Sequence, residues 1–218
     1  VGSEMCIRDS LQAGFNFAPI WKPPFITRLV AEDRCHLNGL AMQDDQPMYV
    51  TACSATDEVA GWRDHRRNGG LVMHIPSNEI IATGLSMPHS PRWYQGKLWI
   101  LNSGTGELGY LDGGQFIPIT FCPGFVRGLA FWKNFALIGL SQLRSKAFTG
   151  LSLETRLAAE NMPVQCGLAV VDLNTGNLLH ALHINGVVEE LFDVVVLPDV
   201  RQPRALGFQD DDIERLIT

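Results

Sequence analysis

Residues 86–109 read SMPHSPRWYQGKLWILNSGTGELG, and this stretch decides the fold. It has a polar start, a turn at Gln95-Gly96-Lys97, an apolar run over residues 98–101 and a second turn at Gly104-Thr105-Gly106. Short apolar runs separated by glycine-containing turns are typical of antiparallel β-hairpins. The stretch therefore predicts a hairpin, and copies of the same plan recur on both sides of it.

Strands are predicted in three successive groups of four. The groups cover residues 36–86, 88–120 and 126–184, and the third contains an insertion at 141–165. Repeated four-stranded meanders of this kind are the signature of a β-propeller. The predicted fold class is therefore all-β, a propeller of four-stranded meander blades, with a β-sandwich as the alternative. The predicted strands are 36–42, 48–54, 70–75, 79–85, 89–94, 97–102, 107–111, 115–120, 126–132, 135–140, 166–173 and 177–184.

The second strand of two of these groups is apolar on both faces. It reads LWIL at residues 98–101 and ALIGL at residues 136–140. A sheet with one face in water would alternate apolar and polar residues, so these runs favour a blade enclosed between two others. Outside the strands, residues 55–68 are expected to form a polar loop, and Ser152 is expected to cap a short helix in the insertion.

The ring is expected to be incomplete in this chain. Three blades and part of a fourth, at residues 189–198, are fewer than closed propellers usually contain. Residues 1–10 fit no helix, strand or targeting pattern and are interpreted as a non-native start, which suggests a fragment. Residues 11–35 are interpreted as the remnant of a preceding blade, and residues 199–218 as a polar acidic tail.

Composition excludes several classes of protein. The net charge of −6 argues against a nucleic-acid-binding protein, which would need a basic face. No apolar run approaches the length of a membrane-spanning helix, so membrane insertion is not expected. The five cysteines are widely spaced and contain no CxxC pair, which predicts reduced thiols and a cytoplasmic location.

Aligning the first strand of each group predicts a site. Residues 38–41 (NGLA) match residues 127–130 (RGLA) at three of four positions. The first strand of each propeller blade lines the central channel, so equivalent positions should form rings around one axis. The residue ring at the head of these strands is His36, His89, Phe125 and Glu190. The polar residues that the alignment places at the channel mouth are His36, Asn38, His89, Arg92, Arg127, Glu190 and Asp193.

These residue types support three interpretations. His36, His89 and Glu190 could hold a divalent metal or act as base and acid on an ester or lactone, which makes them candidate catalytic and metal-ligating residues. Arg92 and Arg127 could instead clamp a carboxylate or phosphate, because guanidinium binds such groups with two parallel bonds. In the third interpretation the histidines hydrogen-bond structural partners and Arg127 forms an ion pair with Glu190.

Long motifs carry a family resemblance. The sequences EDRCHLNGLA (32–41), GLSMPHSPRW (84–93), LWILNSGTGELG (98–109) and PGFVRGLAF (123–131) resemble the TIGR03032, or DUF4915, family of uncharacterised bacterial proteins. The resemblance covers about residues 21–203 and implies members larger than this chain. It transfers no catalytic residue.

Two functions are therefore carried forward. The first is a soluble β-propeller that binds a small molecule or a protein partner at its channel mouth. The second is a metal-dependent hydrolase of lactones or esters, since the NGLA strand at residues 38–41 is similar to calcium-dependent lactonase propellers of the SMP-30 and gluconolactonase type. A divalent metal is the cofactor that the second function would need.

Overall fold

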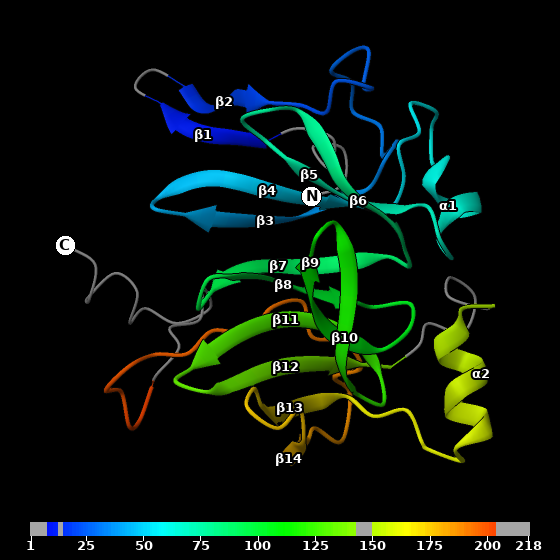
Figure 1. The fold of residues 1–218 in the computed structure, drawn as a ribbon, viewed down its shortest axis with the longest axis vertical. Helices are drawn as coiled ribbons and strands as arrows, with labels where there is room; N and C mark the ends of the chain where they lie inside the picture. Colours follow the sequence, from blue (N-terminus) through cyan, green and yellow to red (C-terminus); the bar gives the residue numbers. More distant parts are fainter. Residues whose placement is uncertain (1–7, 13–14, 143–149, 204–218) are drawn as a thin grey trace.

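The structure is a computed structural model that describes residues 8–12, 15–142 and 150–203 (Figure 1). Its strands form three four-stranded antiparallel sheets and one two-stranded sheet. The first sheet contains β3 (Leu37–Gln43), β4 (Gln46–Ala52), β5 (Gly70–His74) and β6 (Glu79–Leu85). The second contains β7 (Pro88–Tyr94), β8 (Lys97–Asn102), β9 (Glu107–Asp112) and β10 (Gln115–Phe121). The third contains β11 (Phe125–Trp132), β12 (Phe135–Ser141), β13 (Gly167–Asp172) and β14 (Leu178–His183).

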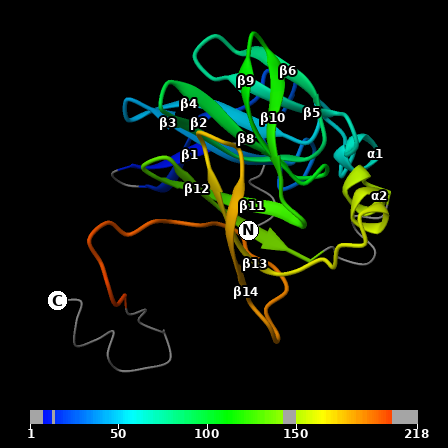
Figure 2. The same ribbon diagram turned by 60° about the horizontal axis from the view of Figure 1, so that its bottom comes forward.

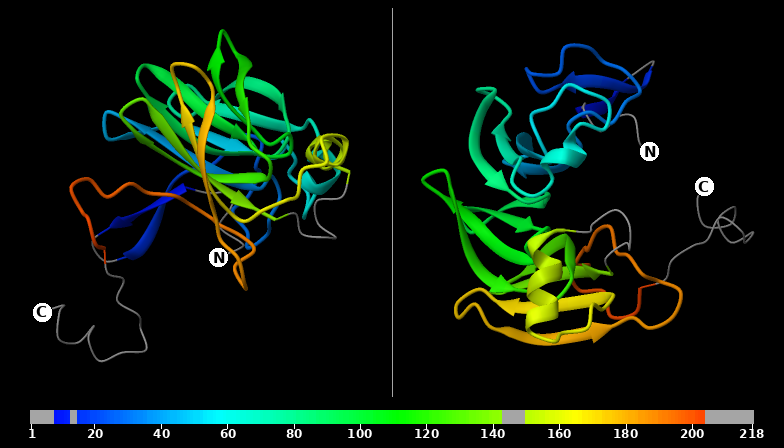
Figure 3. Two further views of the ribbon diagram at one scale, coloured as in Figure 1. Left: turned by 90° about the horizontal axis from the view of Figure 1, so that it is seen from below. Right: turned by 90° about the vertical axis from the view of Figure 1, so that its right-hand side faces the viewer.

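Each large sheet is a meander, because its strands pair in the order of the sequence. The first strands β3, β7 and β11 are neighbours in space and are called here the inner strands. Figure 3 shows the three sheets following one another in a fan. The predicted all-β class and the blade-like meanders are confirmed, and the described residues do not close a ring.

Two apolar layers hold the three sheets together. Strand β8 contributes side chains to both layers, because successive side chains of a strand point alternately towards the two neighbouring sheets. Leu98 and Ile100 pack with residues of the first sheet such as Val72. Trp99 and Leu101 pack with residues of the third sheet such as Ile138. The double-sided burial predicted for the LWIL run is therefore present.

Two helices lie on the same side of the molecule (Figure 1). Helix α1 (Trp62–His65) lies in the loop for which only polar coil was predicted, and Trp62 anchors it because this ring is buried. Helix α2 (Ser152–Ala159) lies in the predicted insertion and buries Leu153 and Leu157. Both leucines belong to an apolar cluster that also contains Phe125, so the insertion is fastened to the third sheet.

Ser152 does not cap α2 as predicted. The N-cap residue is Leu151, without a side-chain cap bond, and Ser152 is the first helical residue. The Ser152 hydroxyl instead donates to the carbonyl of Gly104 at 3.3 Å. Glu154 provides the side-chain hydrogen bond at the N-terminal end of α2, because its carboxylate accepts from the Gly150 amide at 2.8 Å. A carboxylate in the first turn also interacts favourably with the helix dipole.

This geometry predicts unequal costs for two substitutions in α2. Ser152→Ala should lower the free energy of unfolding by less than about 0.5 kcal/mol, because no capping bond is lost. Glu154→Ala should cost about 1 kcal/mol, because the bond to the amide of Gly150 and the dipole interaction both disappear. Urea denaturation of the two variants beside the original protein measures the difference. An equal or larger loss in Ser152→Ala would contradict this assignment of the cap.

The ends of the chain differ from the sequence-based prediction. Residues 8–10, for which no regular structure was expected, belong to β1 (Arg8–Gln12), which pairs with β2 (Phe15–Trp21). Residues 189–198 contain no strand, although a fourth blade was expected to begin there. Figure 2 shows the chain after β14, coloured orange to red, as coil. Residues 1–7, and the part of the predicted tail at 204–218, lie outside the described residues.

No helix in the described ranges is long and apolar enough to cross a membrane.

Candidate ligand-binding site at the inner strands

His89 lies on β7 and is buried, with 5% of its surface exposed. Its Nδ1 lies 2.8 Å from the carbonyl oxygen of Met87 and 3.0 Å from Ser103 Oγ. A carbonyl oxygen only accepts, so Nδ1 carries the hydrogen and Nε2 presents a lone pair. The Ser103 hydroxyl donates to the carbonyl of Val126 on β11 at 2.6 Å. His89 is therefore tied through Ser103 to the neighbouring sheet.

Burial lowers the pKa of His89 to about 3, and the nearby positive charge of Arg127 and the neighbouring His36 act in the same direction. The hydrogen bond to Met87 opposes this shift but does not outweigh burial. The imidazole is therefore neutral at neutral pH. A group this weakly basic is a poor general base, because an effective base has a pKa near the working pH.

Asn38 lies on β3, and its side chain approaches His89 of β7. Its carbonyl oxygen accepts a hydrogen bond from the Thr51 hydroxyl at 2.7 Å. Its amide nitrogen lies 3.4 Å from His89 Nε2 and 3.5 Å from Cys53 Sγ. The contact to His89 is longer than a typical hydrogen bond, and sulfur is a weak acceptor. The amide hydrogens are thus held only weakly by the protein.

His36, placed in one ring with Glu190 by the alignment, contacts Asp33 and Trp62. It precedes β3 with φ 53°, and its Nδ1 lies 2.9 Å from Asp33 Oδ2. The same oxygen accepts from Trp62 Nε1 at 2.9 Å, and the His36 ring stacks on Trp62 at 4.3 Å. The other oxygen of Asp33 is buried without a hydrogen-bond partner among the described atoms. Sequence reasoning missed Asp33, Trp62 and Ser103 as site residues, although Asp33 and Ser103 lie within the motifs at 32–41 and 98–109.

Both predicted arginines form ion pairs with one segment. Arg127 Nη1 on β11 lies 3.7 Å from Glu190 Oε2, and Arg92 Nη2 on β7 lies 3.1 Å from Asp193 Oδ1. The Arg127 guanidinium also lies over the ring of Phe192, 4.5 Å from its centroid. The Arg127–Glu190 pair predicted from the sequence is therefore present, and a second pair accompanies it.

The structure gives no support to the metal-dependent hydrolase. His36 contacts Asp33, His89 contacts Met87 and Ser103, and Glu190 contacts Arg127. In the described part of the chain no three His, Cys, Asp or Glu side chains are grouped so that they could hold a metal ion. Burial, with the nearby charge of Asp33, raises the pKa of the Cys53 thiol. This thiol is therefore protonated and is a poor nucleophile or ligand.

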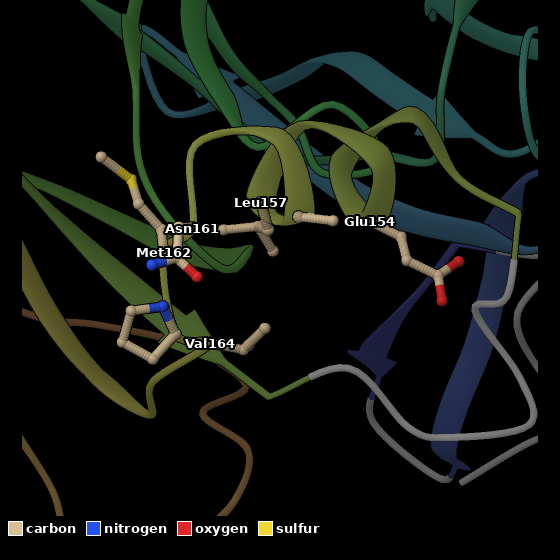
Figure 4. A pocket seen from close by; sticks show the side chains of 7 residues that line it. Glu154, Leu157, Asn161, Met162 and Val164 are labelled. Carbon is tan, nitrogen blue, oxygen red and sulfur yellow. The ribbon is translucent and has the colours of Figure 1, made fainter.

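Two cavities lie away from these residues. One, of about 380 Å³, lies between α2 and residues 161–164 (Figure 4). The other, of about 330 Å³, is mostly apolar and lies against Trp132, Phe135 and residues 196–199. Neither cavity is lined by a residue of the predicted site.

The chain matches the family described as "Domain of unknown function (DUF4915)" over residues 3–206. It belongs to the DUF4915 family. No curated protein matches it. Among solved structures, the crystal structure of the computationally designed Ika8 protein is similar at 15% identity and a TM-score of 0.42, over 75% of this chain and 41% of that chain.

The inner-strand site of this DUF4915 chain combines two arginines, each paired with a carboxylate (Asp193 and Glu190), with neutral polar groups. Arg92 and Arg127 supply the positive charge, Asn38 supplies amide donors and His89 supplies a lone pair. Charged donors bind carboxylates and phosphates strongly, and the neutral groups can accept or donate further bonds. The arrangement is therefore suited to holding an anion and less suited to proton transfer.

Proposed function

We propose that this protein binds a small anionic molecule, carrying a carboxylate or a phosphate, at the mouth formed by its inner strands. Arg92 and Arg127 anchor the anion, Asn38 donates an amide hydrogen bond to it, and the lone pair on His89 Nε2 accepts from a hydrogen-bond donor elsewhere on the ligand. His36 lies at the rim of the same mouth.

One observation supports this proposal above the others. Arg92 and Arg127 stand on two neighbouring inner strands, and each already holds a carboxylate, from Asp193 and Glu190. The space in front of both guanidinium groups therefore accepts carboxylates without rearrangement of the strands. Planar guanidinium groups match carboxylate and phosphate in geometry as well as in charge.

The protein is proposed to work in the cytoplasm. The four cysteines in the described ranges are buried and free: Cys35, Cys53, Cys122 and Cys166. Buried reduced thiols are typical of proteins from reducing compartments.

Charge removal at the arginines tests the proposal. Arg127→Gln and Arg92→Gln should each weaken binding of the best ligand in a panel of carboxylates and phosphates by about tenfold or more, because one charge-assisted hydrogen bond is lost. Isothermal titration calorimetry measures the affinities.

Arg156→Gln is the matched control. Arg156 on α2 also forms ion pairs, with Glu107 and Glu160, so the substitution removes an equal charge outside the site. It should leave the affinity unchanged. If no ligand of the panel binds, or if Arg127→Gln and Arg92→Gln bind as tightly as the original protein, the polar cluster is structural and the proposal is wrong.

A further inference from the structure

Residues 189–193 form a short acidic segment, called here the acidic strap, with the sequence EELFD. It contains three carboxylates in five residues and has no helix or strand. The Glu189 carbonyl accepts from the Gln142 amide at 2.8 Å. The Leu191 amide donates to Ser141 Oγ at 2.9 Å, and Ser141 Oγ donates to the Leu191 carbonyl at 3.1 Å. A few bonds beside the end of β12 therefore fix its backbone.

The acidic strap lies directly on the inner strand β11. A Cβ atom at Gly128 would lie 2.6 Å from the carbonyl carbon of Asp193 and 2.6 Å from the amide nitrogen of Val194. In the same way, Gly39 of β3 is approached closely by Pro91 of β7. The strap thus stands beside β11 as β7 stands beside β3, without joining a sheet.

Three side chains of the acidic strap engage the two arginines. Glu190 and Phe192 contact Arg127, and Asp193 contacts Arg92. The two carboxylates are three residues apart, so their Cα atoms are at most about 10 Å apart. Two anionic groups on one short segment of backbone therefore reach two cations on neighbouring strands at once.

We infer that the acidic strap is an internal competitor for the anion site, and that the ligand carries two anionic groups which replace the carboxylates of Glu190 and Asp193. This inference rests on the proposed function. A compound with two carboxylates on a short flexible spacer reproduces what the strap presents to Arg127 and Arg92. A compound with one carboxylate satisfies only one arginine.

The contacts of the acidic strap are those of a weak competitor. The distance of 3.7 Å between Arg127 and Glu190 exceeds a hydrogen bond. The Asp193 side chain is 66% exposed and Phe192 is 64% exposed, so solvent reaches both. The Arg92–Asp193 pair is therefore screened and contributes little to stability, whereas Arg127 and Glu190 are only 21% and 20% exposed. A ligand can therefore displace the strap. The apparent affinity of this ligand equals its intrinsic affinity multiplied by the fraction of molecules in which the strap has left the site.

The test compares binding of succinate, glutarate, adipate and acetate to the original protein and to the variant Glu190→Gln/Asp193→Asn, by isothermal titration calorimetry. We expect the best dicarboxylate to bind the double variant about tenfold more tightly than the original protein. Acetate should bind both proteins more weakly than that dicarboxylate. The matched control is Asp44→Asn/Asp45→Asn, which removes two charges in the exposed turn between β3 and β4 and should bind as the original protein does.

The outcomes separate the two proposals. If a dicarboxylate binds the original protein and the double variant with equal affinity, the acidic strap does not compete with the ligand, and the proposed function still stands. Acetate binding as tightly as the dicarboxylates would overturn the requirement for two anionic groups. Binding of no carboxylate or phosphate to any of the proteins would overturn the proposed function itself.

A second measurement needs no variant. Amide hydrogen exchange of the original protein is followed with and without saturating dicarboxylate. The Leu191 amide, which donates to Ser141 Oγ, should exchange faster when the ligand displaces the acidic strap. Unchanged or slower exchange at Leu191 in the saturated protein would overturn the displacement.

Discussion

Gly39→Ala is expected to lower the free energy of unfolding by about 3 kcal/mol, or to prevent folding altogether, because the first two sheets meet at this residue. A Cβ atom at Gly39 would overlap Cδ of Pro91 and lie 2.5 Å from Thr51 Oγ1. Pro91 belongs to β7 of the next sheet, and its ring is rigid, so it cannot rotate away. The added methyl group must therefore push the two inner strands apart.

Urea denaturation followed by tryptophan fluorescence measures this loss. Gly124→Ala is the control, because a Cβ atom there would have no neighbour nearer than Leu140 Cβ at 3.3 Å. The contact between Gly39 and Pro91 can also be tested by a double-mutant cycle of Gly39→Ala with Pro91→Ala, because removing the proline ring removes the overlap. The double variant should lose clearly less than the sum of the single losses. Additive losses, or a cost no larger than that of Gly124→Ala, would contradict the close contact.

The match between NGLA at 38–41 and RGLA at 127–130 now has a physical reason. Gly39 admits Pro91 of β7, and Gly128 admits the backbone at residues 193–194. Each first strand needs a glycine where the next segment of the chain crosses it closely. The sequence therefore predicted where residues 189–194 lie, although it wrongly assigned a strand to them.

Strand positions were predictable because the determinants are local. Turn residues and short apolar runs placed most strand ends within one or two residues of the observed bounds. The absence of a strand at residues 189–194 could not be predicted in this way. Its apolar and acidic residues resemble a first strand, but pairing in a sheet depends on a partner strand. The segment instead forms hydrogen bonds to Ser141, at the end of β12, and to Gln142, which follows it.

The histidines show what alignment cannot predict. His36 and His89 occupy equivalent positions in the alignment, yet His36 faces Asp33 and Trp62 while His89 faces Met87 and Ser103. The difference arises from backbone conformation and from residues distant in sequence, because His36 has a positive φ and Trp62 comes from α1. The chemistry inferred from the ring of residues therefore changed, although Arg127 is paired with Glu190 as predicted.

Acidification is expected to destabilise this protein through His89. Its pKa is about 3 in the folded protein, against 6.5 for the ordinary group. Between these values the unfolded chain binds one more proton than the folded chain, so stability falls as the pH decreases from 6.5 towards 3. The loss is about 1.4 kcal/mol per pH unit, which gives about 2 kcal/mol at pH 5. Above pH 6.5 this contribution is constant.

His89→Gln isolates this contribution from the titration of the carboxylates. The variant should be less stable than the original protein at pH 7.5, because glutamine cannot reproduce the contacts to Met87 and Ser103. The gap between the two proteins should then shrink by about 2 kcal/mol at pH 5, because only the original protein carries the buried imidazole. His180→Gln, at an exposed position of β14, should leave the pH dependence unchanged. Parallel stability curves for His89→Gln and the original protein between pH 7.5 and 5 would mean that water reaches His89 and that its imidazole titrates normally in the folded state.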